Sequence, residues 1–111
     1  MNWNKFTDLS QLDNILTESA QKTVVLFKHS TRCSISSMAL SRLERAWKDA
    51  EMQGVSPYFI DLIAYRNVSN KIAEQFEVQH ESPQVLVIKN GICTYHNSHS
   101  GISYEELKQV V

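Results

Sequence analysis

The segment over residues 23–28, Thr-Val-Val-Leu-Phe-Lys, most constrains the fold of this chain. Its apolar, β-branched residues form an unbroken run instead of alternating with polar ones, which is typical of a strand covered on both faces. From residue 34 to about residue 51 an apolar set recurs every three or four positions: Ile35, Met38, Ala39, Leu43, Ala46 and Trp47. That spacing predicts an amphipathic helix. A central strand followed by a long helix predicts an α/β domain.

The other predicted elements complete a mixed sheet. They are a helix beginning at Thr7 or Asp8 and ending near Ser19, a strand over 57–62, a helix capped by Asn67 or Ser69, strands over 84–89 and 92–95, and a helix opening at Ser103. Asn90-Gly91 is typical of a two-residue hairpin, so the last two strands are expected to be antiparallel. Ser103 and Glu106 match the capping-box pattern. We therefore expect a sheet of four strands, or five if residues 4–6 also pair, with helices on both faces.

Composition excludes several functional classes. The 111 residues are expected to form one domain, and 11 Lys and Arg nearly balance 12 Asp and Glu. This balance favours neither nucleic acid nor an anionic membrane as a partner. No apolar run approaches the roughly 20 residues of a membrane span. We expect a soluble, non-exported, cytoplasmic protein whose two cysteines, Cys33 and Cys93, stay reduced.

Cys33 is the residue best placed for chemistry, because it lies between the predicted central strand and the long helix. A helix N-terminus provides unpaired amide N–H groups and the positive end of a dipole, both of which stabilise a thiolate. Lys28, His29 and Arg32 are expected to add positive charge nearby. These features predict that Cys33 is a nucleophile.

The residues around Cys33 resemble a known family. The order of elements, the cysteine at a helix start and Ser82-Pro83 before the hairpin resemble the thioredoxin-like fold. Residues 27–36 and 81–91, together with Ser98-His99-Ser100, are similar to the monothiol bacilliredoxins. Many members of that family have proline where this chain has Ser34. The replacement either softens the first helical turn or alters the thiol's potential.

The resemblance implies a catalytic Cys33 that removes bacillithiol from S-bacillithiolated client proteins. Bacillithiol would be a co-substrate, with no other cofactor and no metal. Ser36 takes the place of the second cysteine of a Cys-x-x-Cys motif, and its hydroxyl cannot undergo disulfide exchange, so the mechanism would be monothiol. Thr31, Arg32, Ser34 and Ser36 would support the active site.

The resemblance also implies a substrate-binding loop. Pro83 would be cis and shape the thiol pocket, while Ser82 would offer backbone groups to the client. Ser98, His99 and Ser100 would contact bacillithiol, with the amides at the start of the final helix receiving a carboxylate. Without the resemblance, the last three residues would be interpreted as an ordinary polar loop.

Other interpretations stay open. The same fold could use glutathione or coenzyme A, or it could be a binding module or carry an iron–sulfur cluster between two subunits. Cys93 is predicted to pack in the core, and His29 and His80 to be polar loop residues. Cys93, His96 and His99 are three residues apart, but such positions on a strand face opposite ways, which disfavours a metal site.

Overall fold

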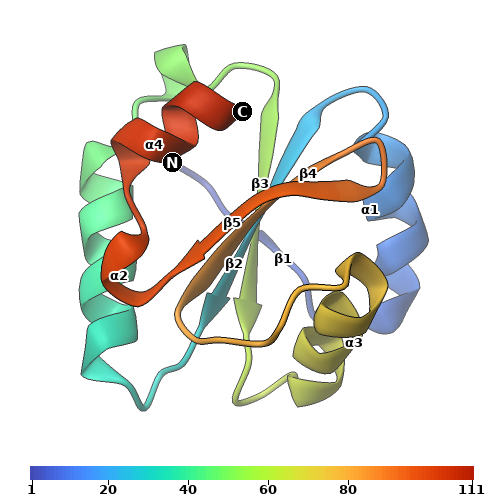
Figure 1. Ribbon diagram of the computed structural model, residues 1–111, viewed down its shortest axis with the longest axis horizontal. Helices are drawn as coiled ribbons and strands as arrows, with labels where there is room; N and C mark the ends of the chain where they lie inside the picture. The colour runs from blue at the N-terminus through green and yellow to red at the C-terminus, as the bar shows by residue number, and fades with distance from the viewer.

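The computed structural model describes residues 1–111 as a five-stranded mixed sheet with helices on both faces (Figure 1). The strand order is β1-β3-β2-β4-β5, in which β1, β3 and β2 are parallel, and β4 is antiparallel to both β2 and β5. The strands are β1 Asn4–Lys5, β2 Thr23–His29, β3 Val55–Asp61, β4 Gln84–Lys89 and β5 Ile92–Ser98. The helices are α1 Leu12–Glu18, α2 Ser34–Ala46, α3 Arg66–Phe76 and α4 Tyr104–Val110, with short 3-10 turns η1 Leu9–Gln11, η2 Asp49–Glu51 and η3 His99–Gly101. The predicted α/β architecture is confirmed.

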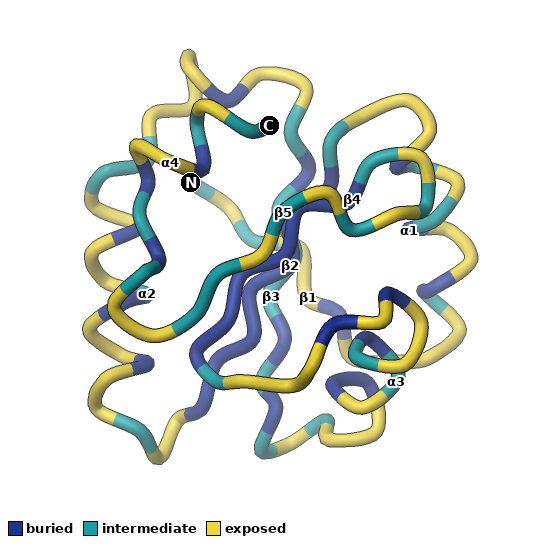
Figure 2. The backbone as a smooth tube through the Cα atoms, viewed as in Figure 1, coloured by how far each residue is buried: buried dark blue, intermediate teal, exposed yellow.

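The central strand β2 separates two apolar cores. Val24 and Leu26 belong to a cluster beneath α1 and α3, whereas Val25 and Phe27 belong to a cluster beneath α2 and α4. Successive side chains of a strand point to opposite faces, so both faces of β2 need apolar residues. Figure 2 shows the resulting band of buried backbone through β2 and its neighbours.

Three chain segments meet at one end of the strands, where β2 ends and β4 begins. The register pairs Lys28 near the end of β2 with Gln84 at the start of β4, and Gln84 with Ser98 at the end of β5. The β2–α2 connection, the segment before β4 and the chain after β5 therefore lie at the same end of the strands (Figure 1). This end of the sheet contains the candidate active site.

The predicted hairpin turn, which connects β4 to β5, lies at the opposite end of the strands. Asn90 and Gly91 have φ angles of 52° and 74°, as a two-residue turn of this type requires. Ser19 at the end of α1 accepts from both turn residues, through its carbonyl from the Asn90 N–H at 2.8 Å and through its hydroxyl from the Gly91 N–H at 2.9 Å. The hairpin is thereby joined to the N-terminal part of the chain.

The long helix is shorter than predicted. It ends at Ala46 because Trp47 has an extended ψ of 125° and leaves the helix. The Trp47 ring packs against Trp3 and Tyr104, with centroid distances of 6.2 Å and 5.9 Å, and the Lys48 N–H donates to the Tyr104 hydroxyl. This aromatic packing accounts for the end of the helix.

The third helix begins differently from the prediction. Its N-cap is Tyr65, which makes no side-chain cap, and both Asn67 and Ser69 lie inside the helix. The preceding turn is held by the Asp61 carboxylate, which accepts from the N–H groups of Ile63 and Ala64.

None of the helices is long and apolar enough to cross a membrane.

Candidate active site

Cys33 is the N-cap residue of α2. Its backbone is extended, with φ −117° and ψ 117°, and its half-buried side chain makes no capping hydrogen bond. The Cys33 N–H donates to the Ser30 carbonyl at 3.2 Å, and the Ser37 N–H donates to the Cys33 carbonyl at 3.1 Å. The first amides of a helix have no acceptor within the helix, and an N-cap side chain is placed to receive them. A thiolate at Cys33 is therefore suited to this position.

Ser36 and His29 form a buried pair beneath Cys33. The Ser36 Oγ lies 2.7 Å from His29 Nδ1 and accepts from the Ser30 N–H at 3.0 Å. Burial lowers the pKa of His29, although Asp61 and Glu44 oppose this, so the neutral ring is favoured. His29 Nδ1 and the Ser36 hydroxyl share one hydrogen bond, and the tautomer of the ring sets which of the two groups donates. The pair fixes the end of β2 to the first turn of α2.

The predictions for His29 and Lys28 were wrong, whereas His80 lies in the loop between α3 and β4, as predicted. His29 is a buried strand residue. Lys28 alternates with His29 along β2, so its side chain points toward α3, away from Cys33 and α2. There the Lys28 ammonium donates to the Ser69 carbonyl at 3.1 Å and to His80 Nδ1 at 3.2 Å. Burial lowers the pKa of Lys28 to about 8. The His80 ring is therefore a partner of a buried cation, and its pKa is also lowered by burial and by Lys28.

The residues that surround Cys33 at the surface are free to contact a substrate. Thr31, Arg32 and Ser34 are exposed, whereas Ser36 is fully buried. Arg32 forms no ion pair, since the three salt bridges of the chain all involve Lys71 or Lys108. Arg32 is thus the cation next to Cys33, as predicted, whereas Lys28 points to the other face of the sheet.

The segment before β4 brings Pro83 to the same end of the sheet as Cys33. Pro83 is buried, its peptide bond with Ser82 is cis, and it directly precedes Gln84, which pairs with Lys28. The hydroxyl of Ser82 is buried and has no hydrogen-bond partner. Pro83 therefore continues β4 beyond Lys28, toward the end of β2 from which the chain leads to Cys33.

The chain after β5 is fixed to this segment. The His99 N–H donates to the Pro83 carbonyl at 3.0 Å, and the Ser98 hydroxyl donates to the Glu81 carboxylate. Ser98 is partly buried, whereas His99 and Ser100 are exposed in η3. The structure thus brings Ser98 and His99 to the Pro83 segment, whereas Ser100 lines a hollow between α2 and α4 with Arg42 and Tyr104.

The final helix begins as predicted, but only half of its capping box is present. The Ser103 hydroxyl accepts from the Glu106 N–H at 3.4 Å, whereas the Glu106 carboxylate accepts from the Tyr95 hydroxyl. Because Ser103 already occupies the Glu106 amide, that group is not free to receive a carboxylate of a ligand.

Comparison with known proteins identifies the family. Residues 4–107 match the family model described as Monothiol bacilliredoxin BrxC. The chain belongs to this bacilliredoxin family. Among solved structures, it is similar to a thioredoxin-fold protein described as a candidate oxidoreductase, with a TM-score of 0.80, 28% identity and coverage of 95% of this chain and 89% of the other. A thioredoxin of Malassezia sympodialis gives a TM-score of 0.76 at 15% identity, covering 98% and 87% of the two chains, which shows the shared fold.

The second cysteine of this bacilliredoxin-family chain lies far from the first. Cys93 pairs with Ile88, which pairs with Val24 at the start of β2. His29 is five positions further along β2 than Val24, or about 17 Å away. Burial raises the pKa of Cys93, and its Sγ donates to the Tyr95 carbonyl at 3.3 Å. Cys93 therefore packs as predicted, and no three His, Cys, Asp or Glu side chains gather as metal ligands.

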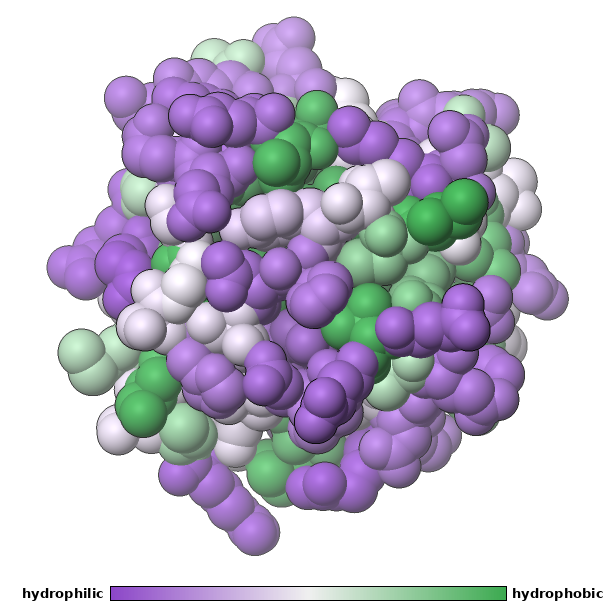
Figure 3. All heavy atoms as spheres, in the orientation of Figure 1, coloured by the Kyte–Doolittle hydropathy of each residue, from purple (hydrophilic) through white to green (hydrophobic).

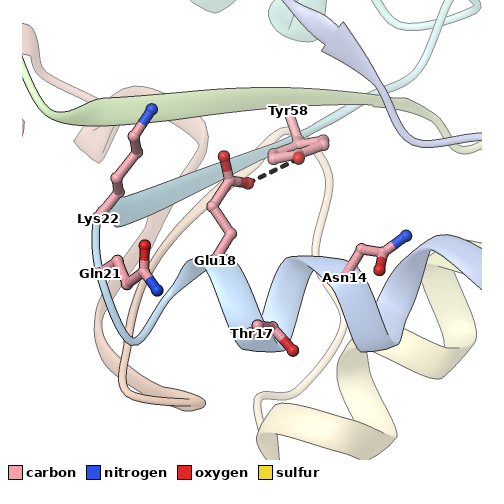
Figure 4. A pocket seen from close by; sticks show the side chains of 6 residues that line it. All are labelled: Asn14, Thr17, Glu18, Gln21, Lys22 and Tyr58. Carbon is pink, nitrogen blue, oxygen red and sulfur yellow. Dashed lines mark hydrogen bonds between the residues drawn. The ribbon is translucent and has the colours of Figure 1, made fainter.

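A polar groove of about 410 Å³ lies between α1 and β3 (Figure 4). Its lining includes Lys22, just before β2, and Tyr58, whose hydroxyl donates to the Glu18 carboxylate at 2.7 Å. Burial and this bond raise the pKa of Tyr58 to about 12. The groove contains no thiol and lies toward the start of β2, so it does not belong to the candidate active site of this bacilliredoxin-family chain.

Proposed function

We propose that this chain is a monothiol thiol-disulfide oxidoreductase that removes bacillithiol from S-bacillithiolated proteins, with Cys33 as the nucleophile. Membership of the bacilliredoxin family and the thioredoxin fold support a redox role. The observation that carries the monothiol mechanism is Ser36, which is fully buried and bonded to His29 where a dithiol enzyme would have its resolving cysteine. Cys93, at the opposite end of the sheet, cannot replace it.

The reaction proceeds in two thiol-disulfide exchanges. The Cys33 thiolate attacks the bacillithiol sulfur of the client's mixed disulfide, and the client cysteine leaves as a thiolate that takes a proton from water. A second bacillithiol thiolate then attacks the bacillithiol sulfur held by Cys33. This step releases bacillithiol disulfide and regenerates the Cys33 thiolate. The client cysteine is reduced and one free bacillithiol is consumed, while the bacillithiol removed from the client leaves as half of bacillithiol disulfide, so the number of disulfide bonds is unchanged.

The exposed groups around Cys33 suit such a substrate. Bacillithiol joins cysteine to a glucosamine–malate unit and so presents hydroxyls and carboxylates. We assign Thr31 and Arg32 to the groups nearest the sulfur, because both are exposed next to Cys33. Ser98 and His99 are hydrogen-bonded to the Pro83 segment, and we assign them, together with Ser100, to contacts with bacillithiol. The backbone of Ser82 is assigned to pairing with an extended substrate segment.

The test compares two adducts of one model client. We expect Cys33-dependent removal of bacillithiol to be at least about tenfold faster than removal of glutathione, which needs roughly 1.4 kcal/mol of differential transition-state binding. Cys93→Ser is the matched control and should retain activity. Equal rates for the two adducts, or turnover by Cys33→Ser, would refute the proposal. A coloured dimer after purification would instead support an iron–sulfur role.

A further inference from the structure

The outer face of α2 carries apolar side chains that the sequence pattern assigned to the core. Ile35 and Met38 are 53% and 66% exposed, whereas the buried residues of the helix are Ser36, Ala39 and Leu43. In Figure 3 hydrophobic side chains reach the surface at the lower left, over the N-terminal part of α2. The helix therefore presents an apolar surface directly beside the nucleophile.

The same face becomes cationic farther along the helix. Arg42 and Arg45 follow Ile35 and Met38 at helical spacing, and we call these four residues the α2 stripe. A hollow of about 400 Å³ lies along it, lined by Met38, Arg42 and Arg45 together with Ser37 and Ser41.

The two arginines of the α2 stripe have no acidic partner. Arg42 donates to the Ile102 carbonyl at 3.1 Å and Arg45 to the Ser41 carbonyl, and neither forms an ion pair. The one acid of α2, Glu44, accepts from the Trp3 indole at 2.8 Å. A chain with net charge −1 thus concentrates positive charge on this face.

The dimensions of the α2 stripe fit a short extended segment. At 1.5 Å per helical residue, Arg42 and Arg45 lie about 14 Å and 18 Å along the axis from Cys33. An extended peptide covers that distance in about four to five residues. The turn η3, which the proposed function assigns to bacillithiol, packs against α2, and the Arg42 guanidinium donates to the carbonyl of Ile102 just after it. The hollow that Met38, Arg42 and Arg45 line contains no residue of η3, so we assign this surface to the client.

We propose, building on the proposed function, that the α2 stripe docks the client segment next to its modified cysteine. The favoured client has an apolar residue near that cysteine and acidic residues four to five positions away. The apolar residue packs on Ile35 and Met38, and the acidic residues pair with Arg42 and Arg45. The surface thus selects among modified proteins, while Cys33 performs the same exchange on each of them.

Peptides test this preference directly. Each peptide carries one cysteine in a disulfide with bacillithiol, a leucine two positions away, and Glu, Gln or Lys at the fourth and fifth positions, on either side. We expect kcat/KM for the Glu peptide to exceed that for the Gln peptide by about threefold to tenfold, the change expected for two exposed ion pairs, with Lys lowest. In 0.5 M NaCl the preference should largely disappear, because salt screens exposed charges.

Charge reversal identifies the surface. Arg42→Glu with Arg45→Glu should reverse the order of the Glu and Lys peptides. Arg45→Glu alone, which keeps the Arg42–Ile102 bond, should abolish most of the preference. Lys5→Glu with Lys22→Glu is the matched control, since it changes the net charge equally at exposed residues outside α2. Equal rates for all peptides, or an unchanged order after reversal, would overturn the docking surface.

Binding separates this inference from the proposed function. Unmodified Glu and Lys peptides are titrated into Cys33→Ser, and the backbone amide shifts of α2 are followed. Tighter binding of the Glu peptide with shifts along the α2 stripe supports the docking surface even if no peptide is turned over, a result that would refute only the proposed function. Equal binding of both peptides, or shifts elsewhere, refutes the docking surface.

Discussion

Lys28 should make the stability of this fold rise with pH in an alkaline window. The fully buried ammonium is bonded only to the neutral Ser69 carbonyl and the His80 ring, with no carboxylate. The pKa of Lys28 falls from 10.5 to about 8. Between these values the unfolded chain holds a proton that the folded chain has released, so raising the pH through this window favours the folded state.

The size of the effect follows from the same shift. A lowering of the pKa from 10.5 to about 8 corresponds to roughly 3 kcal/mol at neutral pH. The hydrogen bonds from the ammonium to the Ser69 carbonyl and the His80 ring stabilise the charged form and reduce this, so we expect about 2 kcal/mol. Lys28→Met removes the titration. The absolute stability of this variant also changes, because the Ser69 carbonyl and His80 lose a donor, but that loss does not vary between pH 7.5 and 10.5.

Urea unfolding at several pH values measures the effect. The free energy of unfolding of the wild type minus that of Lys28→Met should increase by about 2 kcal/mol from pH 7.5 to 10.5. Tyrosines and cysteines titrate equally in both proteins and cancel in the difference. Lys22→Met, at an exposed position, is the control and should give a flat difference. A flat or falling difference for Lys28→Met would show that Lys28 is not a buried cation.

Three other predictions concern the thiols and the buried pair. Alkylation with limiting reagent, followed by peptide mass mapping, should label Cys33 before Cys93, whose pKa is raised by burial; preferential labelling of Cys93 contradicts the site assignment. Ser36→Cys should form a disulfide with Cys33 on mild oxidation, because residues three apart in the first helical turn lie on one face; no loss of free thiol would show that this geometry is wrong. Ser36→Ala should lower the free energy of unfolding by about 1–3 kcal/mol and Ser34→Ala by under about 0.5, since only the former leaves buried His29 without its partner; equal losses in urea titrations would contradict this.

Local signals explain most of what could be predicted of the fold. The Asn90-Gly91 turn, the Ser103 cap and the apolar run in β2 each depend on neighbouring residues, and all are present. The end of α2 was mispredicted because it depends on Trp47 packing against Trp3 from the other end of the chain. Aromatic packing over such a sequence separation leaves no local pattern.

The candidate site was predictable in part for the same reason. Cys33 at a helix start was visible in the sequence, whereas the bond between His29 and Ser36 joins a strand to a helix and needs the packed structure. The sequence did contain a signal that Lys28 lies away from Cys33. Alternation along β2 places it opposite to His29, and knowing that α2 covers the His29 face would have separated Lys28 from Cys33.

The strand order has a consequence for synthesis of the chain on the ribosome. The central strand β2 lies between β3 and β4, both of which follow it in sequence, and β4 ends at Lys89. A nascent chain that stops before Gln84 exposes β2 as a sheet edge with apolar residues on both faces, the kind of edge that recruits other chains. Because Cys33 comes from the first half of the sequence and Pro83 from the second, the candidate active site assembles only when most of the protein has been made.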